Sequence, residues 1–492
     1  MSRKADRPFG LGRYDAAVLL GSVIYLYANL LTSAHTPLLL GGDEQVFWMN
    51  AQRLLHGELV YRDFFEFTPP GTDLAYLAAF RLFGSQVWVT NLVVLLLGAA
   101  LSWLCYRVAC SVLRPALAAV TAALFLVFDY GSWLDGTHHW FSMLAVMGAL
   151  AALLSRTSNS KLLICGALLG TASFFTQTRG AMAAMGVAGY LVWERFQTRD
   201  SWFHCLRRQS LLALSFLSAW GVLSSYFIFR VGFPRLWYFQ FTFVRQYMRN
   251  QWNGLPPDSV LSWPLRYSIA YFAMPAVCSL ALWKLLRTQR DMSSLCQRRI
   301  ALLAFVGAAL FLEVAQSPNW LRVYCVAIPS FVLAMWLICD QVGSYRPHLT
   351  GLLCVGLVVY AAHQAWVRQL EHSVTVDLPG GRVAAVPLAG EKLGWIAKHT
   401  EPGQYFFQSR LPGVYLPLAL RIPTFTFLFH ETRPEFLELS MRQLEQKRVR
   451  YILWSPGLET PWYLFATFHQ FLLDHYHKVW TFSDQEEIWE RN

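Results

Sequence analysis

The sequence predicts a mainly α-helical, polytopic membrane protein that ends in a small α/β domain outside the cytoplasm. Three observations support this fold class. Hydrophobic residues make up 55% of the 492 residues and charged residues only 14%, which is not typical of a soluble globular protein. Apolar runs of about 17–25 residues, the length that crosses a bilayer, recur along the first three quarters of the chain. After about residue 370 the apolar runs shorten, and strand-like patterns alternate with helix-like ones.

Eleven apolar runs are predicted to cross the membrane. They cover residues 15–33, 87–109, 115–130, 138–154, 162–177, 180–194, 210–230, 263–286, 300–316, 320–339 and 349–367. The first run follows several basic residues, as in a signal peptide, but it is long and no small-residue cleavage site stands out after it. We therefore interpret it as an uncleaved first helix.

Basic residues in the short loops predict the orientation. If the N-terminus is cytoplasmic, most basic loop residues lie inside, and the short external loops keep few of them, among them Arg179 and Arg322. The first external loop (residues 34–86), the segment 231–262 and the chain after about residue 368 then face the non-cytoplasmic side. We expect a multi-pass protein of the inner (plasma) membrane.

The net charge of +11 does not indicate a nucleic-acid partner. Residues 372–492 contain 12 basic and 13 acidic residues, so the positive excess lies in the membrane part. Cytoplasmic loops and anionic lipids account for an excess there. All nine cysteines fall in predicted spans or cytoplasmic loops, so the sequence predicts neither a disulfide framework nor a CxxC metal site.

The first external loop contains the most informative stretch, GGDEQVFWMNAQRLLHGELVYRDFFEFTPPG at residues 41–71. Its five carboxylates are Asp43, Glu44, Glu58, Asp63 and Glu66. Asp43 and Glu44 begin a helical pattern, where an acidic residue stabilises the helix dipole and a cap is the simple interpretation. That interpretation leaves Glu66, just before Pro69-Pro70, unexplained. We predict a catalytic carboxylate in this loop, at the membrane surface.

Two amphipathic segments flank the sequence YRDFFEFTPPG, and both are expected to lie along the membrane interface. The second covers residues 72–83. Within the sequence between them, Arg62, Asp63 and Glu66 are predicted to contact substrate.

The next external turn, FDYGSWLDGTHHWFS at residues 128–142, brings two histidines close to carboxylates. Asp135 and His138 are candidates for substrate contact. His138 and His139, together with Glu313, are candidate metal ligands. The alternative, which the spacing leaves open, is a role for the histidines in hydrogen bonding at the aromatic belt.

Two arginines are expected at the outer membrane boundary. Gln177 and Arg179 lie in a very short turn, where Arg179 either reaches lipid phosphates or binds a substrate phosphate. Arg322 either pairs with Glu313 or binds phosphate through its planar guanidinium, and it is the preferred phosphate ligand of the two arginines. In the segment 231–262, Arg245 and Arg249 predict a basic interfacial helix for anchoring or for contact with a lipid-linked substrate.

The tail is divided into a Gly/Pro-containing linker at 371–388 and an α/β domain at 389–492, which follow a membrane domain at 1–370. Predicted strands are GQYFFQS (403–409), PTFTFLF (423–429), RYILWS (450–455) and HKVWTFS (477–483), and predicted helices lie at 391–400, 433–448 and 460–476. The tail has no GxGxxG, P-loop or GxSxG motif, so it suggests no separate nucleotide or hydrolase site.

The predicted carboxylates and arginines lie together at the outer membrane boundary. This arrangement suits a substrate that has a hydroxyl to deprotonate and a phosphate to bind. Nucleotide sugars are scarce outside the cytoplasm, so we expect a polyprenyl-phosphate-linked sugar donor. The acceptor would be a glycan, a lipid or a protein, and membrane lipids would surround the spans. Phosphate is a weakly basic leaving group, so the reaction needs one general base and no general acid. The acceptor hydroxyl would attack from the face opposite the phosphate, which inverts the anomeric carbon.

Four segments carry a resemblance to a known superfamily: residues 41–72, FFTQTRG at 174–180, WLRVYCVAIPSFVLA at 320–334, and the tail ending in EEIWER. The chain resembles the C-type (GT-C) membrane glycosyltransferases, which include protein O-mannosyltransferases and aminoarabinose transferases. It is most similar to the bacterial dolichyl-phosphate-mannose-protein mannosyltransferase-like members. The resemblance implies that Asp43 is the catalytic base, with Glu44 beside it.

The chain differs from these relatives at two points, with Thr68 before the Pro-Pro pair and Gln177-Thr178-Arg179 in the span-five turn. Metal use varies across the superfamily, so the resemblance establishes no cofactor and leaves a divalent metal ion open. Two other functions remain as alternatives. One is a lipid-linked glycan transporter, which predicts repeated halves or charges at the membrane midplane. The other is a noncatalytic subunit of envelope assembly.

Overall fold

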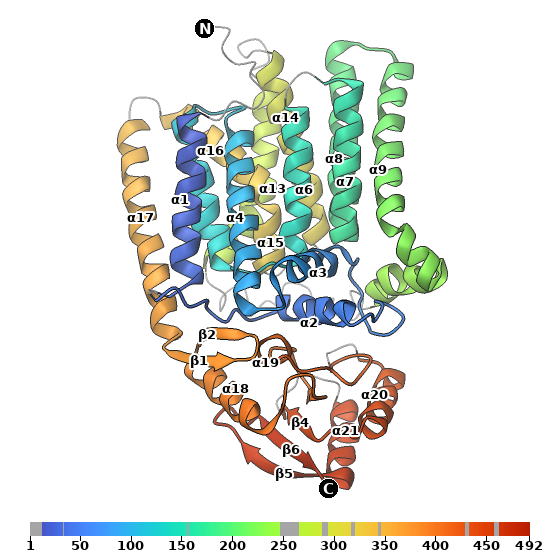
Figure 1. The fold of residues 1–492 in the computed structure, drawn as a ribbon. Helices are drawn as coiled ribbons and strands as arrows, with labels where there is room; N and C mark the ends of the chain where they lie inside the picture. Colours follow the sequence, from blue (N-terminus) through green and yellow to red (C-terminus); the bar gives the residue numbers. More distant parts are fainter. Residues whose placement is uncertain are drawn as a thin grey trace.

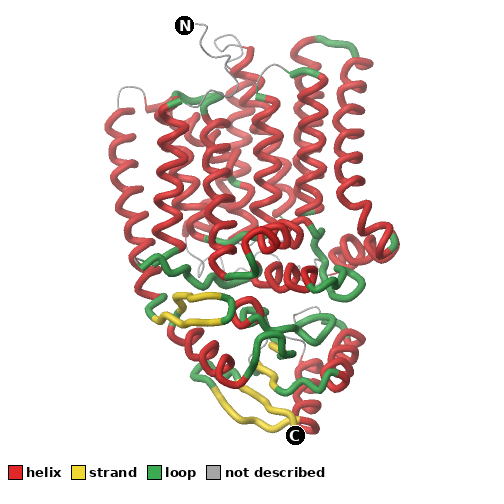
Figure 2. The backbone as a smooth tube through the Cα atoms, viewed as in Figure 1, coloured by secondary structure: helices red, strands yellow, loops and turns green. Residues whose placement is uncertain are grey.

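A computed structural model describes residues 12–32, 34–154, 157–246, 265–287, 294–315, 320–342, 346–428, 432–456 and 462–492. The long helices run side by side as a bundle, and the C-terminal domain lies at one end of it (Figure 1). Two short helices, α2 (Glu44–Leu55) and α3 (Gly71–Phe83), lie across that end, between the bundle and the C-terminal domain (Figures 1 and 2).

The bundle consists of helices that coincide with the predicted spans. They are α1 (Arg13–Leu30), α4 (Val87–Ala109), α5 (Pro115–Leu124), α6 (His138–Leu153), α7 (Asn159–Phe175), α8 (Gln177–Thr198), α9 (Trp202–Val231), α13 (Leu265–Arg287), α14 (Ser294–Val314), α15 (Trp320–Val326), α16 (Ile328–Val342) and α17 (Arg346–Glu371). Helix α5 continues as the π-helical η1 (Phe125–Asp129) and the short 3₁₀ turn η2 (Tyr130–Ser132). In the described part, five helices are long and apolar enough to cross a membrane, which agrees with a multi-pass protein. The count of eleven spans stays a prediction.

Small residues allow the helices to pack closely, as is common in membrane bundles. A Cβ atom at Gly170 of α7 would lie 2.3 Å from the carbonyl oxygen of Phe216 on α9. A Cβ atom at Gly180 of α8 would lie 2.2 Å from the carbonyl oxygen of Leu169 on α7. The helix pairs α7/α9 and α7/α8 therefore depend on glycine at these positions.

The segment 231–262 is described as far as residue 246. It forms α10 (Phe233–Trp237) and the π-helical η3 (Tyr238–Phe243). Buried Phe239 and Phe243 of η3 pack in one hydrophobic cluster with buried Phe65 of the first external loop. This part of the segment therefore serves as core packing against that loop. Arg249 lies outside the described residues, and the predicted basic interfacial helix is not tested.

The C-terminal domain combines a hairpin with a four-stranded sheet. Its elements are β1 (Val374–Leu378), β2 (Gly381–Ala385), α18 (Pro387–His399), β3 (Phe407–Gln408), α19 (Tyr415–Leu418), α20 (Pro434–Gln446), β4 (Tyr451–Trp454), α21 (Trp462–His475), β5 (Tyr476–Thr481) and β6 (Glu487–Arg491). The sheet order is β3-β4-β6-β5, with β3 parallel to β4 and the other pairs antiparallel.

Two predictions for the tail are wrong. The segment 371–388 is not a linker, because most of it forms the end of α17 and the β1-β2 hairpin, in which Gly381, the first residue of β2, has φ 104°. A glycine pair marks a tight hairpin turn as readily as a linker. The described part of the predicted strand 423–429 forms no strand, because its backbone groups bind the first external loop and α20, as described below.

The first external loop and the C-terminal domain share one hydrophobic core. Phe47 and Trp48 of α2 and Tyr76 of α3 lie in the same cluster of buried side chains as Val383 of β2 and Tyr415 of α19.

Backbone hydrogen bonds also join these two parts of the chain. The N–H of Leu39 donates to the carbonyl of Ala384 at 2.8 Å, and the N–H of Val87 donates to Gly380 at 2.9 Å. Residues 34–86 therefore complete one part of the core of the C-terminal domain, which also has a cluster of its own around Phe407 and Trp454.

Candidate active site

Asp43 occupies the N-cap position of α2, but its side chain forms no capping hydrogen bond. Its side chain is exposed, yet the surrounding protein atoms raise the pKa of the Asp43 carboxyl above 3.8, and the nearby positive charge of Arg322 partly opposes that rise. Arg322, half-buried on α15, is thus close enough to act on Asp43 electrostatically. This neighbourhood contains a carboxylate and a cation.

Glu44 follows Asp43 but is fully buried. Its Oε2 accepts a hydrogen bond of 2.9 Å from the N–H of Gly136, in the turn between η2 and α6. Burial raises the pKa of Glu44 well above its usual range, and the negative charges of Asp135 and Asp43 add to the rise. Glu44 therefore links α2 to the second external turn, residues 133–137, through this hydrogen bond.

Asp135 lies in that turn and is buried. Its Oδ1 accepts hydrogen bonds from Oγ1 of Thr137 at 3.1 Å and from the N–H of Thr137 at 3.4 Å. Burial raises the pKa of Asp135 to about 7, the Thr137 bonds oppose the rise, and the charge of Asp43 adds to it. The structure thus brings Asp43, Glu44 and Asp135 into one electrostatically coupled group.

Glu66 is engaged within its own turn. Its Oε1 accepts hydrogen bonds from the N–H groups of Phe67 and Thr68, both at 2.8 Å, and from Oγ1 of Thr68. Its Oε2 accepts from Nδ2 of Asn50 at 2.8 Å, and Asn50 also donates to Asp73 at 3.2 Å. Glu66 is 3% exposed, so this carboxylate shapes the Pro-Pro turn from inside the fold.

Asn50 and Asp73 were not among the predicted site residues. Both are fully buried, and burial raises the pKa of Asp73 well above its usual range, with the charge of Glu66 adding to the rise. The sequence signal that would have indicated them is a polar residue on the otherwise apolar face of each amphipathic helix.

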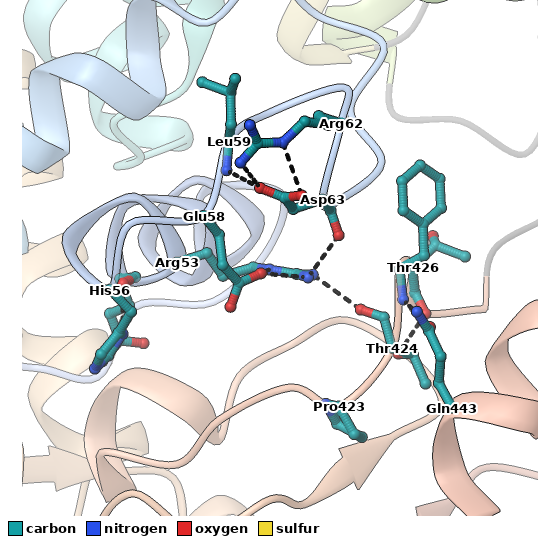
Figure 3. Close-up of polar contacts among 12 residues, drawn as sticks. Arg53, His56, Glu58, Leu59, Arg62, Asp63, Pro423, Thr424, Thr426 and Gln443 are labelled. Carbon is teal, nitrogen blue, oxygen red and sulfur yellow. Dashed lines mark hydrogen bonds and ion pairs between the residues drawn. The ribbon is translucent and has the colours of Figure 1, made fainter. Parts of the chain in front are cut away.

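Arg62 and Asp63 pair with each other on the surface of the first external loop (Figure 3). The two hydrogen bonds of 2.7 and 3.0 Å from the Arg62 guanidinium hold the pKa of Asp63 below its usual range. Oδ2 of Asp63 also accepts from the N–H of Leu59 at 2.8 Å. Asp63 therefore closes a local turn.

Gln177 and Arg179 are both occupied by protein groups. Nε2 of Gln177 donates to the carbonyl of Gln240 at 2.9 Å. Arg179 is fully buried and forms an ion pair with Glu313, Nε to Oε2 at 3.1 Å. The sequence suggested Arg322 as the ion-pair partner of Glu313, whereas the structure pairs Glu313 with Arg179.

His138 and His139 lie side by side at the start of α6, with ring centroids 4.0 Å apart and ring planes tilted by 38°, and the ring centroid of Phe47 lies 5.6 Å from that of His138. Among the residues that the structure describes, no three or more His, Cys, Asp or Glu side chains gather so that they could hold a metal ion. The candidate ligands His138, His139 and Glu313 therefore form no such group within that part of the chain.

Comparisons with known proteins agree with the fold. Residues 68–222 match the family model for dolichyl-phosphate-mannose-protein mannosyltransferases, whereas a comparison with curated protein sequences gave no match. The structure of ArnT from Cupriavidus metallidurans bound to undecaprenyl phosphate is 16% identical and has a TM-score of 0.62. It covers 97% of this chain and 97% of that chain.

A second similar structure is the Archaeoglobus fulgidus oligosaccharyltransferase tethered with an acceptor peptide containing an NVT sequon. It is 12% identical, covers 97% of this chain and 74% of that chain, and has a TM-score of 0.57. Likeness at such low identity establishes the fold alone. Together with the family match, it confirms the resemblance predicted from the sequence: the chain has the fold of the GT-C membrane glycosyltransferases, and residues 68–222 carry a sequence pattern of that superfamily.

Proposed function

We propose that the protein is an inverting glycosyltransferase that moves a sugar from a polyprenyl phosphate to an acceptor hydroxyl on the extracytoplasmic side of the membrane. The observation that carries the proposal is the grouping of Asp43, Glu44 and Asp135 beside Arg322. A carboxylate base and a cation at one place are the two groups that this transfer requires. The bound undecaprenyl phosphate of the similar ArnT structure supports a lipid phosphate as donor.

Asp43 is assigned as the base because it is the exposed member of the carboxylate group. Glu44 is buried and accepts from Gly136, so its assignment is to hold the second external turn in place. A pKa above the usual aspartate range also makes Asp43 a better proton acceptor near neutral pH.

In the proposed reaction the acceptor oxygen bonds to the anomeric carbon while the bond from that carbon to the phosphate oxygen breaks. The acceptor proton passes to Asp43, and the electron pair of the broken bond leaves with the polyprenyl phosphate. Arg322 stabilises the departing phosphate charge. Attack on the face opposite the phosphate inverts the anomeric carbon.

The test uses the purified protein with undecaprenyl- or decaprenyl-phosphate sugars, and it measures release of the free polyprenyl phosphate with glycan, lipid and peptide acceptors. Asp43→Asn is expected to lower the rate by about 10²–10⁴-fold, the usual contribution of a general base. The matched control is Asp377→Asn, because that carboxylate lies in the C-terminal domain with its side chain 84% exposed. Full transfer by Asp43→Asn would remove this residue from the base role.

A further inference from the structure

Arg53, in the last turn of α2, joins three segments of the chain through one guanidinium (Figure 3). Its Nε donates to Oε2 of Glu58 at 2.7 Å, and a second nitrogen donates to the carbonyl of Asp63 at 3.1 Å. The third donates to the carbonyl of Thr424 in the C-terminal domain at 3.0 Å. The first two contacts are local, whereas the third bridges 371 positions in the sequence.

A gain in folding stability does not explain why the Arg53 guanidinium is buried. The Arg53 side chain is 7% exposed, while its ion-pair partner Glu58 is 36% exposed. A buried ion pair stabilises a fold little more than well-packed apolar side chains of the same size. An arginine differs from any apolar residue because its planar fork of donors can hold separate segments in one fixed geometry.

Thr424 belongs to a segment that is itself held firmly. The N–H of Phe425 donates to Oε1 of Gln443 on α20 at 2.6 Å. The carbonyl of Phe425 accepts from the N–H of Phe65 in the first external loop at 2.9 Å. Nζ of Lys447 donates to the carbonyl of Pro423. Arg53 therefore binds to an anchored point of the C-terminal domain, which is why residues 423–428 do not form the predicted strand.

The C-terminal domain also contacts the other end of α2. A Cβ atom at Gly413 would lie 3.0 Å from the amide group of Gln45, and Gln45 follows directly after Asp43 and Glu44. A helix of 12 residues is about 18 Å long and nearly rigid, so a shift at one end moves the other. The orientation of α2 thus depends on the C-terminal domain at both ends.

We propose that Arg53 is a positioning residue, through which the C-terminal domain holds α2 so that Asp43 reaches the acceptor hydroxyl. This inference rests on the proposed function. It makes the C-terminal domain a working part of the active site, linked to it through Arg53, the single arginine in the sequence of α2.

The test compares Arg53→Gln with Arg53→Lys and Glu58→Gln. The matched control is Arg442→Gln, which breaks an exposed ion pair of α20 at 3.3 Å. Arg53→Gln is expected to lower kcat by about 10–100-fold with the KM for the donor little changed, because a misplacement near 1 Å at the reacting groups has an effect of this size. Arg53→Lys keeps the positive charge but loses the planar set of guanidinium donors. Its kcat should therefore lie between that of Arg53→Gln and that of the wild type. Arg442→Gln should match the wild type.

Glu58→Gln removes the local ion pair but leaves the bond to Thr424, so it should affect kcat far less than Arg53→Gln. If Glu58→Gln reproduces the whole effect, the link to the C-terminal domain is not the cause and the inference is overturned. A fall in folded yield with unchanged kcat per folded molecule would overturn it as well.

Amide hydrogen exchange supplies a readout that does not depend on turnover. In Arg53→Gln, exchange should rise at Phe425 and Phe65 and also at Val46, whose N–H bonds the carbonyl of Asp43 at 3.1 Å. A rise confined to residues 53–64 would overturn the inference even if the wild type transfers no sugar. Absence of transfer by the wild type would count against the proposed function alone.

Discussion

Arg179 and Glu313 form an ion pair inside the helix bundle, with Nε of the arginine 3.1 Å from Oε2 of the glutamate. The two side chains are 0% and 8% exposed, and they join α8 to α14. Arg179 also donates to the carbonyl of His139 on α6 at 3.0 Å. Three helices thus meet at one guanidinium, close to the end of the bundle that carries the carboxylate group.

Arg179→Met is expected to destabilise the protein by about 3–5 kcal/mol, because it leaves the charge of Glu313 buried without its partner. The double variant Arg179→Met/Glu313→Leu should regain most of the lost stability. Thermal unfolding of the purified protein measures both. The control is Arg62→Met, since an exposed pair contributes only about 0–1 kcal/mol. A double variant as unstable as the single one would contradict this explanation.

The rate of transfer is expected to fall as the pH drops through the pKa of Asp43, because only the deprotonated carboxylate accepts a proton. Desolvation by the surrounding protein atoms raises that pKa above 3.8, and the charge of Arg322 partly opposes the rise. Replacing Arg322 with Met removes the opposing charge, so the acid limb of the pH–rate profile should move to higher pH. Arg322→Lys keeps the charge and serves as the control. An acid limb that stays in place in Arg322→Met would show that the two groups do not interact.

Asp135 should make stability depend on pH. The folded protein holds the proton of Asp135 up to a pKa of about 7, whereas the ordinary value is 3.8. Between these values the unfolded chain releases a proton that the folded one keeps, so stability falls as the pH rises from about 4 to about 7. Asp135→Asn is expected to flatten part of this slope, and melting temperatures across that range test it. Asp377→Asn, at an exposed site, should leave the slope unchanged.

Gly136 is the position where the second external turn meets Tyr76 of α3. A Cβ atom at Gly136 would lie 2.0 Å from the tyrosine oxygen and 3.1 Å from its Cζ, so Gly136→Ala should destabilise the turn and displace Asp135. Adding Tyr76→Phe removes the nearer clash and should restore part of the stability and activity. The control Gly394→Ala, in α18, meets nothing within 4 Å and should stabilise the protein by about 0.4–1 kcal/mol. If Gly136→Ala and Gly394→Ala lose the same amount of stability, the clash with Tyr76 is not the cause.

Much of the fold was accessible from the sequence because hydropathy and periodicity are local. The predicted spans fall on helices, and the two amphipathic segments of the first external loop form α2 and α3. The hairpin at β1 and β2 was missed, since its glycine turn also fits a linker. The segment 423–428 has the composition of a strand, but its carbonyl groups bind Arg53 and Phe65 instead of a neighbouring strand.

The sequence by itself determined that a membrane bundle carries its carboxylates in the loop after the first helix, because charge and apolar length are read from neighbouring residues. Only the tertiary structure decided what each charged group does. Glu44 meets Gly136 across 92 positions, and Arg179 meets Glu313 across 134. Such partners are chosen by the packing of distant segments, and burial then decides which carboxylate is enclosed, as Glu66 is, and which stays exposed, as Asp43 does.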